Sequence, residues 1–216
     1  MIKYDRFWVT MKERGITQYD LYEHYQITRS LLDRLRKNKN VEISIIMGSD
    51  SDLNIMVECF KILDEFEISY DINILSAHRT PEELDNYIDK VNKENIKIVI
   101  AVAGGAAHLA GVIASKILCP VIGVPIYTKS LNGIDSLYST IQMPSGVPVA
   151  TVGINASKNA GLLAIKMLGL ENLKIKEKLI HYNQMQANKV INKNKKIHDL
   201  GYEKYLEEMR NESKNI

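Results

Sequence analysis

The sequence predicts an α/β protein, in which helices cover both faces of a parallel sheet, preceded by a short all-α segment. From residue 41 onward, five apolar stretches alternate with helical patterns. These stretches are almost continuously apolar, which is typical of parallel strands buried on both faces. Residues 1–40 differ, because they show only short helical patterns with polar caps. We therefore expect two parts, residues 1–40 and residues 41–216.

The sequence pattern of residues 1–40 predicts three short helices, "DRFWVTMKER", "TQYDLYEHY" and "TRSLLDRLRKN". Thr17 and Thr28 are suitable N-caps for the second and third helices, and Gly15 ends the first. This part carries nine Lys or Arg against five Asp or Glu, so the basic excess of a chain with a formal charge of +2 lies here. No Gly, Ser or Pro linker follows, since "NKN" runs directly into the first strand.

The second part alternates strands with helices. The strand candidates are "EISIIM", "YDINIL", "KIVIAV", "PVIGVPI" and "VPVATVG", and helical patterns occupy residues 52–65, 81–94, 107–117 and 156–168. A last helical pattern runs from residue 175 to about residue 195. It is either an arm that packs on a neighbouring subunit or a solvated helix on its own subunit.

The composition of the 216 residues, 45% hydrophobic and 25% charged, is ordinary for a globular protein. No apolar run approaches the ~20 residues that span a bilayer, and the N-terminus contains no signal-peptide core. We therefore expect a cytoplasmic protein without membrane contact. Cys59 and Cys119 show no metal-binding or redox spacing and are expected to be buried thiols.

Polar residues follow the first three predicted strands, in the loops "GSDSD", "SAHRTP" and "AGGAAH". In an open parallel sheet, ligands bind beyond the carboxyl ends of the strands, where loops meet helix N-termini. These three loops must therefore lie along one edge of the sheet. Together they contribute Ser49, Asp50, Ser51, Asp52, Ser76, His78, Arg79, Gly104, Gly105 and His108.

These residue types indicate a site for a phosphate-bearing small molecule. Serine hydroxyls, an arginine fork and the N–H groups of helix starts form a phosphate cradle, and paired glycines let a ligand approach the backbone. Asp52 is suited to accept hydrogen bonds from two vicinal sugar hydroxyls. Histidine suits proton transfer near neutral pH, so His78 and His108 are candidate acid/base groups.

Each residue also has a structural alternative. Ser49 or Ser51 could cap the following helix, Arg79 could pair with a glutamate of that helix surface, and His78 could be a satisfied structural histidine. A binding site is favoured because three separate loops bring the same chemistry to one edge. Two other classes do not fit: "AVAGG" lacks the aspartate of a receiver domain, and "GSDSD" lacks the glycines of a dinucleotide site. Two histidines with carboxylates also fall short of a metal ligand set.

Six motifs carry a family resemblance: "IIMGSDSD", "LSAHRTPE", "AVAGGAAHLAGVIA", "PVIGVPI", "LNGIDSLYSTIQMPSGVPVATVGI" and "NAGLLA". In uninterrupted order, over about residues 42–195, they closely resemble the bacterial-type 5-(carboxyamino)imidazole ribonucleotide mutases of the phosphoribosylaminoimidazole carboxylase family. The resemblance implies a flavodoxin-like three-layer sandwich and a homo-octamer with sites between subunits. It also implies a step of purine biosynthesis, in which a carboxylate moves from the exocyclic amine to ring carbon 4 without metal or cofactor.

The same resemblance implies roles for individual residues. His78 is the general acid/base, and the ribose and phosphate are held by Ser49, Asp52, Ser76 and Arg79. The pocket for the base and the migrating carbon dioxide is lined by Gly104, Gly105, Ala106 and His108, while "LNGIDSLYS" and "MPSGVP" close it. Two other functions stay open: a direct carboxylase of aminoimidazole ribonucleotide that uses carbon dioxide, and a DNA-binding regulator that senses a purine intermediate.

The N-terminal part resembles the opening of Cro/repressor-type helix-turn-helix domains, in "MKERGITQYDLYEHYQITRSLLDRLRKN". The resemblance implies that the last helix enters the major groove, with Thr28, Arg29 and Ser30 near base edges. Such domains normally continue into further helices, whereas here a strand begins, and ~40 residues is near the lower limit for independent folding. A truncated remnant packed on the enzyme is therefore favoured over DNA recognition, and an oligomerisation or partner-binding role is a third interpretation.

Overall fold

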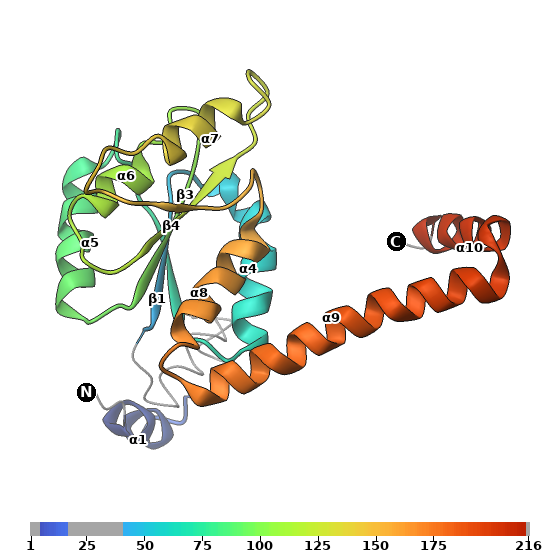
Figure 1. Ribbon diagram of the computed structural model, residues 1–216. Coiled ribbons are helices and arrows are strands. Elements are labelled where there is room, and N and C mark those ends of the chain that lie inside the picture. The colour runs from blue at the N-terminus through green and yellow to red at the C-terminus, as the bar shows by residue number, and fades with distance from the viewer. Residues whose placement is uncertain (1–4, 17–40, 215–216) are drawn as a thin grey trace. The chain divides into compact units, whose positions relative to one another are not determined.

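The computed structural model describes residues 5–16 and 41–214, which form two compact units, residues 1–168 and residues 169–216 (Figure 1). The first unit contains a five-stranded, fully parallel sheet in the order β2-β1-β3-β4-β5. Its strands are β1 (Ile43–Met47), β2 (Tyr70–Ile74), β3 (Ile98–Gly104), β4 (Val121–Ile126) and β5 (Ala150–Thr151). The five predicted strands and their parallel arrangement are confirmed.

Helices cover both faces of the sheet (Figure 1). One face packs against α5 (Pro81–Lys93) and α6 (Leu109–Ala114), and the other against α4 (Leu53–Glu65) and α8 (Ser157–Leu168). On the first face, Leu84 and Ile88 of α5 and Ile113 of α6 meet strand side chains in one buried apolar cluster. The predicted three-layer sandwich is therefore confirmed, and it matches the apolar composition of the strands.

On the opposite face, α8 and α4 approach closely at Gly161. A Cβ atom there would lie 2.7 Å from Ile62 Cγ2 and 3.2 Å from Cys59 Sγ, so the contact requires glycine. Cys59 is fully buried, and burial raises the pKa of its thiol to about 12. Cys119 is only half-buried, which corrects the expectation of two buried thiols.

One helix of the first unit was not predicted: α7 (Ile134–Ile141) follows β4. It begins after Gly133, which has a left-handed φ of 82°. Its inward face carries small polar side chains, with Ser136 and Thr140 buried, whereas Ile134 and Tyr138 are exposed. Because serine and threonine are weak helix formers, and the apolar residues lie on the outer face, the segment does not show the pattern of a core-facing helix.

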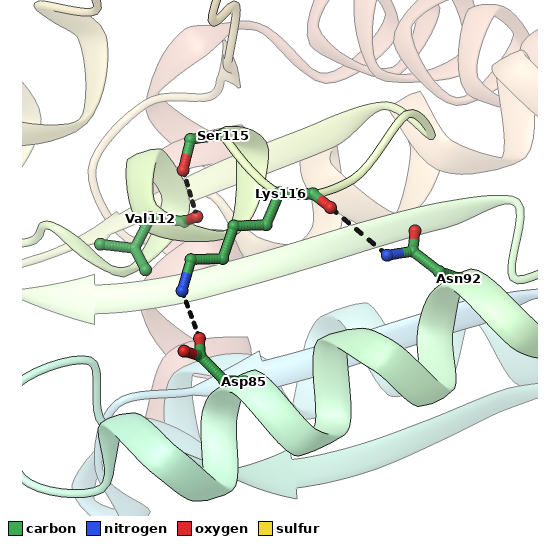
Figure 2. Close-up of polar contacts among 5 residues, drawn as sticks. All are labelled: Asp85, Asn92, Val112, Ser115 and Lys116. Carbon is green, nitrogen blue, oxygen red and sulfur yellow. Dashed lines mark hydrogen bonds and ion pairs between the residues drawn. The ribbon is translucent and has the colours of Figure 1, made fainter.

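The α5 helix is also tied to the turn that follows α6 (Figure 2). The Lys116 ammonium pairs with the Asp85 carboxylate, and the Lys116 carbonyl accepts a hydrogen bond from Asn92 Nδ2 at 3.3 Å. Ser115 Oγ donates to the Val112 carbonyl at 2.8 Å within the same turn. These contacts fix the end of α6 on the surface of the unit.

The second unit consists of α9 (Leu173–Leu200) and α10 (Tyr202–Lys214). Asn172 caps α9, and Lys196 of α9 pairs with Glu208 of α10 at 2.5 Å. The predicted helix is confirmed but is longer than expected, and α10 was not predicted from its charged sequence. Within the described residues, no helix is both long and apolar enough to cross a membrane.

The first predicted N-terminal helix is present as α1 (Asp5–Glu13). The other two, "TQYDLYEHY" and "TRSLLDRLRKN", lie outside the described residues. The predicted boundary at residue 40 therefore stays a prediction.

Candidate active site

A cavity of about 620 Å³ opens at the carboxyl ends of the strands. The strand order reverses between β1 and β3, and such a switch point is where open α/β sheets bind ligands. The cavity is lined by Gly48, Ser49, Ser51, Asp52, Ile55, Ser76, Ala77, His78, Arg79, Ala103, Gly104, Ala106, Leu109, Ile126, Tyr127, Thr128 and Asn155. Seven of the nine predicted site residues therefore line one cavity, and Gly105 and His108 do not.

The loop after β1 forms a single 3-10 turn, η1 (Asp50–Asp52), that leads into α4. Ser49 has an extended backbone, and its Oγ accepts hydrogen bonds from the Ser51 N–H at 3.3 Å and the Ser51 hydroxyl at 2.9 Å. The capping interpretation of Ser49 is therefore correct, and Ser49 also lines the cavity. Because these two hydrogen bonds use both lone pairs of the oxygen, a ligand hydroxyl that donates to Ser49 Oγ would take the place of the Ser51 hydroxyl.

Asp52 is almost completely buried, with 6% of its surface exposed. Burial raises the pKa of its carboxyl above the usual value, while hydrogen bonds from Ser51 and from the backbone of Ser49 lower it by less. A buried carboxylate has lost its hydrating water, so a ligand that donates hydrogen bonds to it stabilises its charged form.

Replacing Asp52 with Asn should raise the melting temperature of the ligand-free protein at pH 7. The folded pKa lies above the unfolded value of 3.8, so this carboxyl makes the protein less stable as pH rises from 3.8 through the folded pKa. The gain should vanish well below pH 3.8, where Asp52 is protonated in both the folded and the unfolded state. Thermal unfolding across this pH range measures it, with exposed Asp50→Asn as the control; a lower melting temperature at pH 7 would contradict the argument.

The loop after β2 joins the loop after β1 through an arginine. Ser76 Oγ accepts the Arg79 N–H at 3.2 Å, and Thr80 Oγ1 accepts the Ser76 N–H at 2.9 Å, so the loop is internally braced. Arg79 Nη2 donates to the Gly48 carbonyl at 2.9 Å. Arg79 therefore reaches across to the first loop, and since its Nε–H donates to Ser76 Oγ at 3.5 Å, the remaining donors on its two Nη atoms are available to an anion.

Two histidines meet at the cavity. His78 Nε2 lies 3.0 Å from His108 Nδ1, and the rings are edge-on, at 82° with centroids 5.1 Å apart. This hydrogen bond needs an N–H on one ring and a lone pair on the other. The two rings therefore share one proton at this contact, and only His78 lines the cavity. His108 contacts His78 and not the cavity itself, so its expected place in the lining stays a prediction.

The loop after β3 turns sharply at Gly105, which has a left-handed φ of 65°. Gly104 and Ala106 line the cavity on either side of it. The Gly105 N–H instead donates to Ser136 Oγ of α7 at 2.8 Å. Glycine readily adopts a positive φ, which allows the sharp turn here. Gly105 thus shapes the cavity wall without lining the cavity.

Three polar lining residues were missed by sequence reasoning: Tyr127, Thr128 and Asn155. They follow β4 and β5, so the rule that finds ligand sites after strands would have found them if applied to all five strands. Asn155 Oδ1 accepts the Tyr127 N–H at 2.8 Å, which ties these two loops together. The segments "LNGIDSLYS" and "MPSGVP" contribute no residue to the cavity lining, so their closing of the pocket stays a prediction.

The fold and the site define a class of protein: a doubly wound α/β protein with a polar cavity at its switch point, equipped for an anionic ligand and for proton transfer. Among the described residues, no group of three or more His, Cys, Asp or Glu side chains could hold a metal ion.

The chain belongs to the AIR carboxylase family, whose model matches residues 42–189. It is 53% identical to the N5-carboxyaminoimidazole ribonucleotide mutase of Pyrococcus horikoshii, over 80% of this chain and 97% of that protein. It is 48% identical to the phosphoribosylaminoimidazole carboxylase of Candida glabrata, over 76% of this chain but 29% of that protein. A crystal structure of Treponema denticola PurE superposes with a TM-score of 0.67 at 31% identity, covering 72% of this chain and 97% of that one.

A second match lies at the N-terminus. Residues 6–48 match the model of the Cro/C1-type helix-turn-helix DNA-binding domain. The predicted helix-turn-helix resemblance is therefore confirmed at the level of sequence. The last part of this match falls on β1 (Ile43–Met47), which belongs to the sheet of the first unit.

Proposed function

We propose that the chain is an N5-carboxyaminoimidazole ribonucleotide mutase, which converts 5-(carboxyamino)imidazole ribonucleotide into 4-carboxy-5-aminoimidazole ribonucleotide in purine biosynthesis. The observation that carries the proposal is the cavity, where His78 and Arg79 stand beside two serines and a buried aspartate. The similarity to proteins of that name over nearly their whole length supports it.

We propose the following division of roles. Arg79 and Ser76 bind the phosphate, because a guanidinium and a hydroxyl at the start of α5 are a natural anion site. Ser49 and Asp52 hold the ribose hydroxyls. Gly104 and Ala106, with the neighbouring turn at Gly105, form the wall against the base, and His108 orients His78.

The proposed reaction is balanced in protons. His78 gives a proton to the carbamate nitrogen as the carbon–nitrogen bond breaks and carbon dioxide is released. Ring carbon 4 then attacks the trapped carbon dioxide, and His78 removes the proton from this carbon. The histidine returns to its initial state, so the step needs an acid/base group, close positioning and exclusion of water.

The test is a comparison of two substrate mixtures. Purified protein should form the 4-carboxy product from 5-(carboxyamino)imidazole ribonucleotide in buffer freed of bicarbonate, and without ATP. A direct carboxylase, the alternative, would form it only from aminoimidazole ribonucleotide with carbon dioxide. Turnover of the second mixture alone would therefore contradict the mutase assignment.

We also propose that the chain forms a homo-oligomer, an octamer by family resemblance, through the outer face of α7. Leu131, Ile134, Tyr138 and Ile141 follow helical spacing, and each is more than 40% exposed. An apolar stripe of this kind is typical of a surface that another molecule covers. His78 and Arg79 are also exposed in the single chain, whereas a trapped intermediate requires a closed pocket.

Replacing Tyr138 with Asp should therefore split the assembly into smaller species and lower activity, because it places a charge in the covered surface. Analytical ultracentrifugation measures the assembly. Leu118→Asp, at a fully exposed leucine in the turn after α6, is the matched control. An intact assembly in Tyr138→Asp would contradict the role of the α7 stripe.

For the N-terminal segment, we propose a truncated helix-turn-helix element that does not recognise DNA by itself. The match to a DNA-binding domain and the basic excess of residues 1–40 favour binding. Its overlap with β1 argues against a complete domain. The full chain and a chain starting at Val41 should therefore retain duplex DNA equally and negligibly. Stronger, salt-sensitive retention by the full chain would contradict this and favour a regulator.

A further inference from the structure

Among the contacts between α7 and the wall of the cavity, one is made by a fully buried hydroxyl. Ser136 has no exposed surface. Its Oγ accepts the Gly105 N–H at 2.8 Å and donates to the Ile126 carbonyl at 2.6 Å. One side chain therefore connects the loop after β3 with the end of β4, and residues of both line the cavity.

We propose that Ser136 is a positioning residue for the reaction: it holds the β3 loop against β4 and so fixes the place of the His78–His108 pair. The proposal rests on the proposed function, because it concerns the same acid/base group. Ser136 does not line the cavity, so its effect is transmitted through the loop.

The transmission follows a short chain of contacts. The Gly105 carbonyl accepts the Ala107 N–H at 2.8 Å, and the Ala106 carbonyl accepts the His108 N–H at 2.8 Å. The turn from Gly105 to His108 is thus tightly hydrogen-bonded. A shift of Gly105 moves His108, whose Nδ1 lies 3.0 Å from His78 Nε2. A displacement of about 1 Å in a catalytic group can cost about 100-fold in rate.

The residue before Ser136 strengthens the same connection. Asp135 accepts hydrogen bonds from Thr128 Oγ1 at 2.8 and 3.0 Å, and Thr128 lines the cavity. The start of α7 therefore contacts the cavity wall at two points, the loop after β3 and the loop after β4. Loss of the Ser136 hydroxyl would leave the Gly105 N–H and the Ile126 carbonyl without this partner. The β3 loop would then be held to β4 and α7 only by the sheet pairing of Gly104 with Ile126 and by the longer hydrogen bond, at 3.4 Å, from Ser139 Oγ to the Gly105 carbonyl.

A looser wall has a specific consequence for a carboxylate transfer. Carbon dioxide released in the cavity is either captured by ring carbon 4 or escapes to solvent. If the loop moves, His78 no longer stays aligned with carbon 4, and escape competes with capture. In Ser136→Ala, the rate should therefore fall, and a smaller share of the released carbon dioxide should be captured by ring carbon 4. A protein that is only less stable would not lose a larger share of its carbon dioxide.

The test uses the full chain and substrate with carbon-13 in the carbamate. In Ser136→Ala, kcat should fall about 10- to 100-fold with a KM within about threefold of the wild type. The share of label released as bicarbonate in the presence of enzyme should rise above the wild-type share. Hydrogen exchange of the peptide that contains Gly105 should also be faster, since its N–H has lost an acceptor.

Thr140→Val is the matched control. Thr140 is also buried in α7, but its hydroxyl donates to the Ser136 carbonyl of the same helix at 2.7 Å instead of bonding the β3 loop. In this variant, the carbon-13 label should divide between the 4-carboxy product and bicarbonate as it does in the wild type. If Ser136→Ala does not fold, Ser136→Cys, whose thiol is a weak donor and acceptor, should give an intermediate leak.

The outcomes separate this inference from the proposed function. Wild-type coupling and exchange in the folded Ser136 variants would overturn the positioning role while leaving the mutase intact. The same partition defect in Thr140→Val would also overturn it, because the effect would then belong to α7 in general. Absence of label transfer in the wild type would overturn the proposed function itself, and the inference with it.

Discussion

His78→Asn should lower kcat by at least ~10²–10⁴-fold, the range that a general acid/base typically contributes. His78 is the histidine that lines the cavity, and it lies in the loop between β2 and α5. Asparagine keeps a polar side chain of similar size but cannot donate and recover a proton near neutral pH. Both halves of the proposed reaction should fail together, because the same group serves each.

His78→Asn should still bind the nucleotide. The phosphate and ribose contacts proposed for Arg79 and Asp52 do not involve the imidazole, so calorimetric titration with the product should give a dissociation constant close to that of the wild type. His198→Asn, in the exposed part of α9, is the control and should be fully active. An active His78→Asn enzyme would remove His78 from the chemistry.

Arg79→Gln should produce the opposite kinetic pattern. A hydrogen bond to a charged group contributes about 1.5–3 kcal/mol, which corresponds to about 10- to 100-fold in kcat/KM. The phosphate is remote from the reacting carbon, so it is bound equally in the ground state and the transition state. The loss should therefore appear mainly as a higher KM, with kcat little changed.

The control for Arg79→Gln is Lys116→Gln, which removes one surface cation in the same way. Lys116 pairs with Asp85 on the outside of α5 and does not line the cavity (Figure 2). Exposed ion pairs contribute about 1 kcal/mol or less, so this variant should fold and turn over normally. Equal losses in both variants would mean that general charge, and not a phosphate contact, governs binding.

The fold was largely predictable because its strands are buried on both faces. Continuous apolar stretches such as "VEISIIM" and "KIVIAV" have few alternatives in a parallel α/β sheet. Prediction failed for α7, whose apolar side chains lie outward, and for α10, whose charged sequence shows no buried stripe. In both cases the missing signal is an inward-facing apolar pattern.

The candidate site was predictable for the three strands whose following loops were searched for ligand-binding residues. The loops after β1 and β2 gave Ser49, Asp52, Ser76, His78 and Arg79, and the loop after β3 gave Ala106; the structure brings all of them into one cavity. The support from Ser136 was not predictable, because it depends on a helix whose orientation no local pattern reveals. Likewise, the His78–His108 hydrogen bond spans 30 residues and needs the packing of two loops.

The most direct test of the account follows one carbon atom. The enzyme receives 5-(carboxyamino)imidazole ribonucleotide with carbon-13 in the carbamate, together with unlabelled bicarbonate in excess and no ATP, and NMR follows the label. A mutase should give labelled carboxylate on ring carbon 4, formed faster than label appears in bicarbonate. Product that carries only unlabelled carbon would contradict the mutase assignment, because the carboxylate would then come from solution.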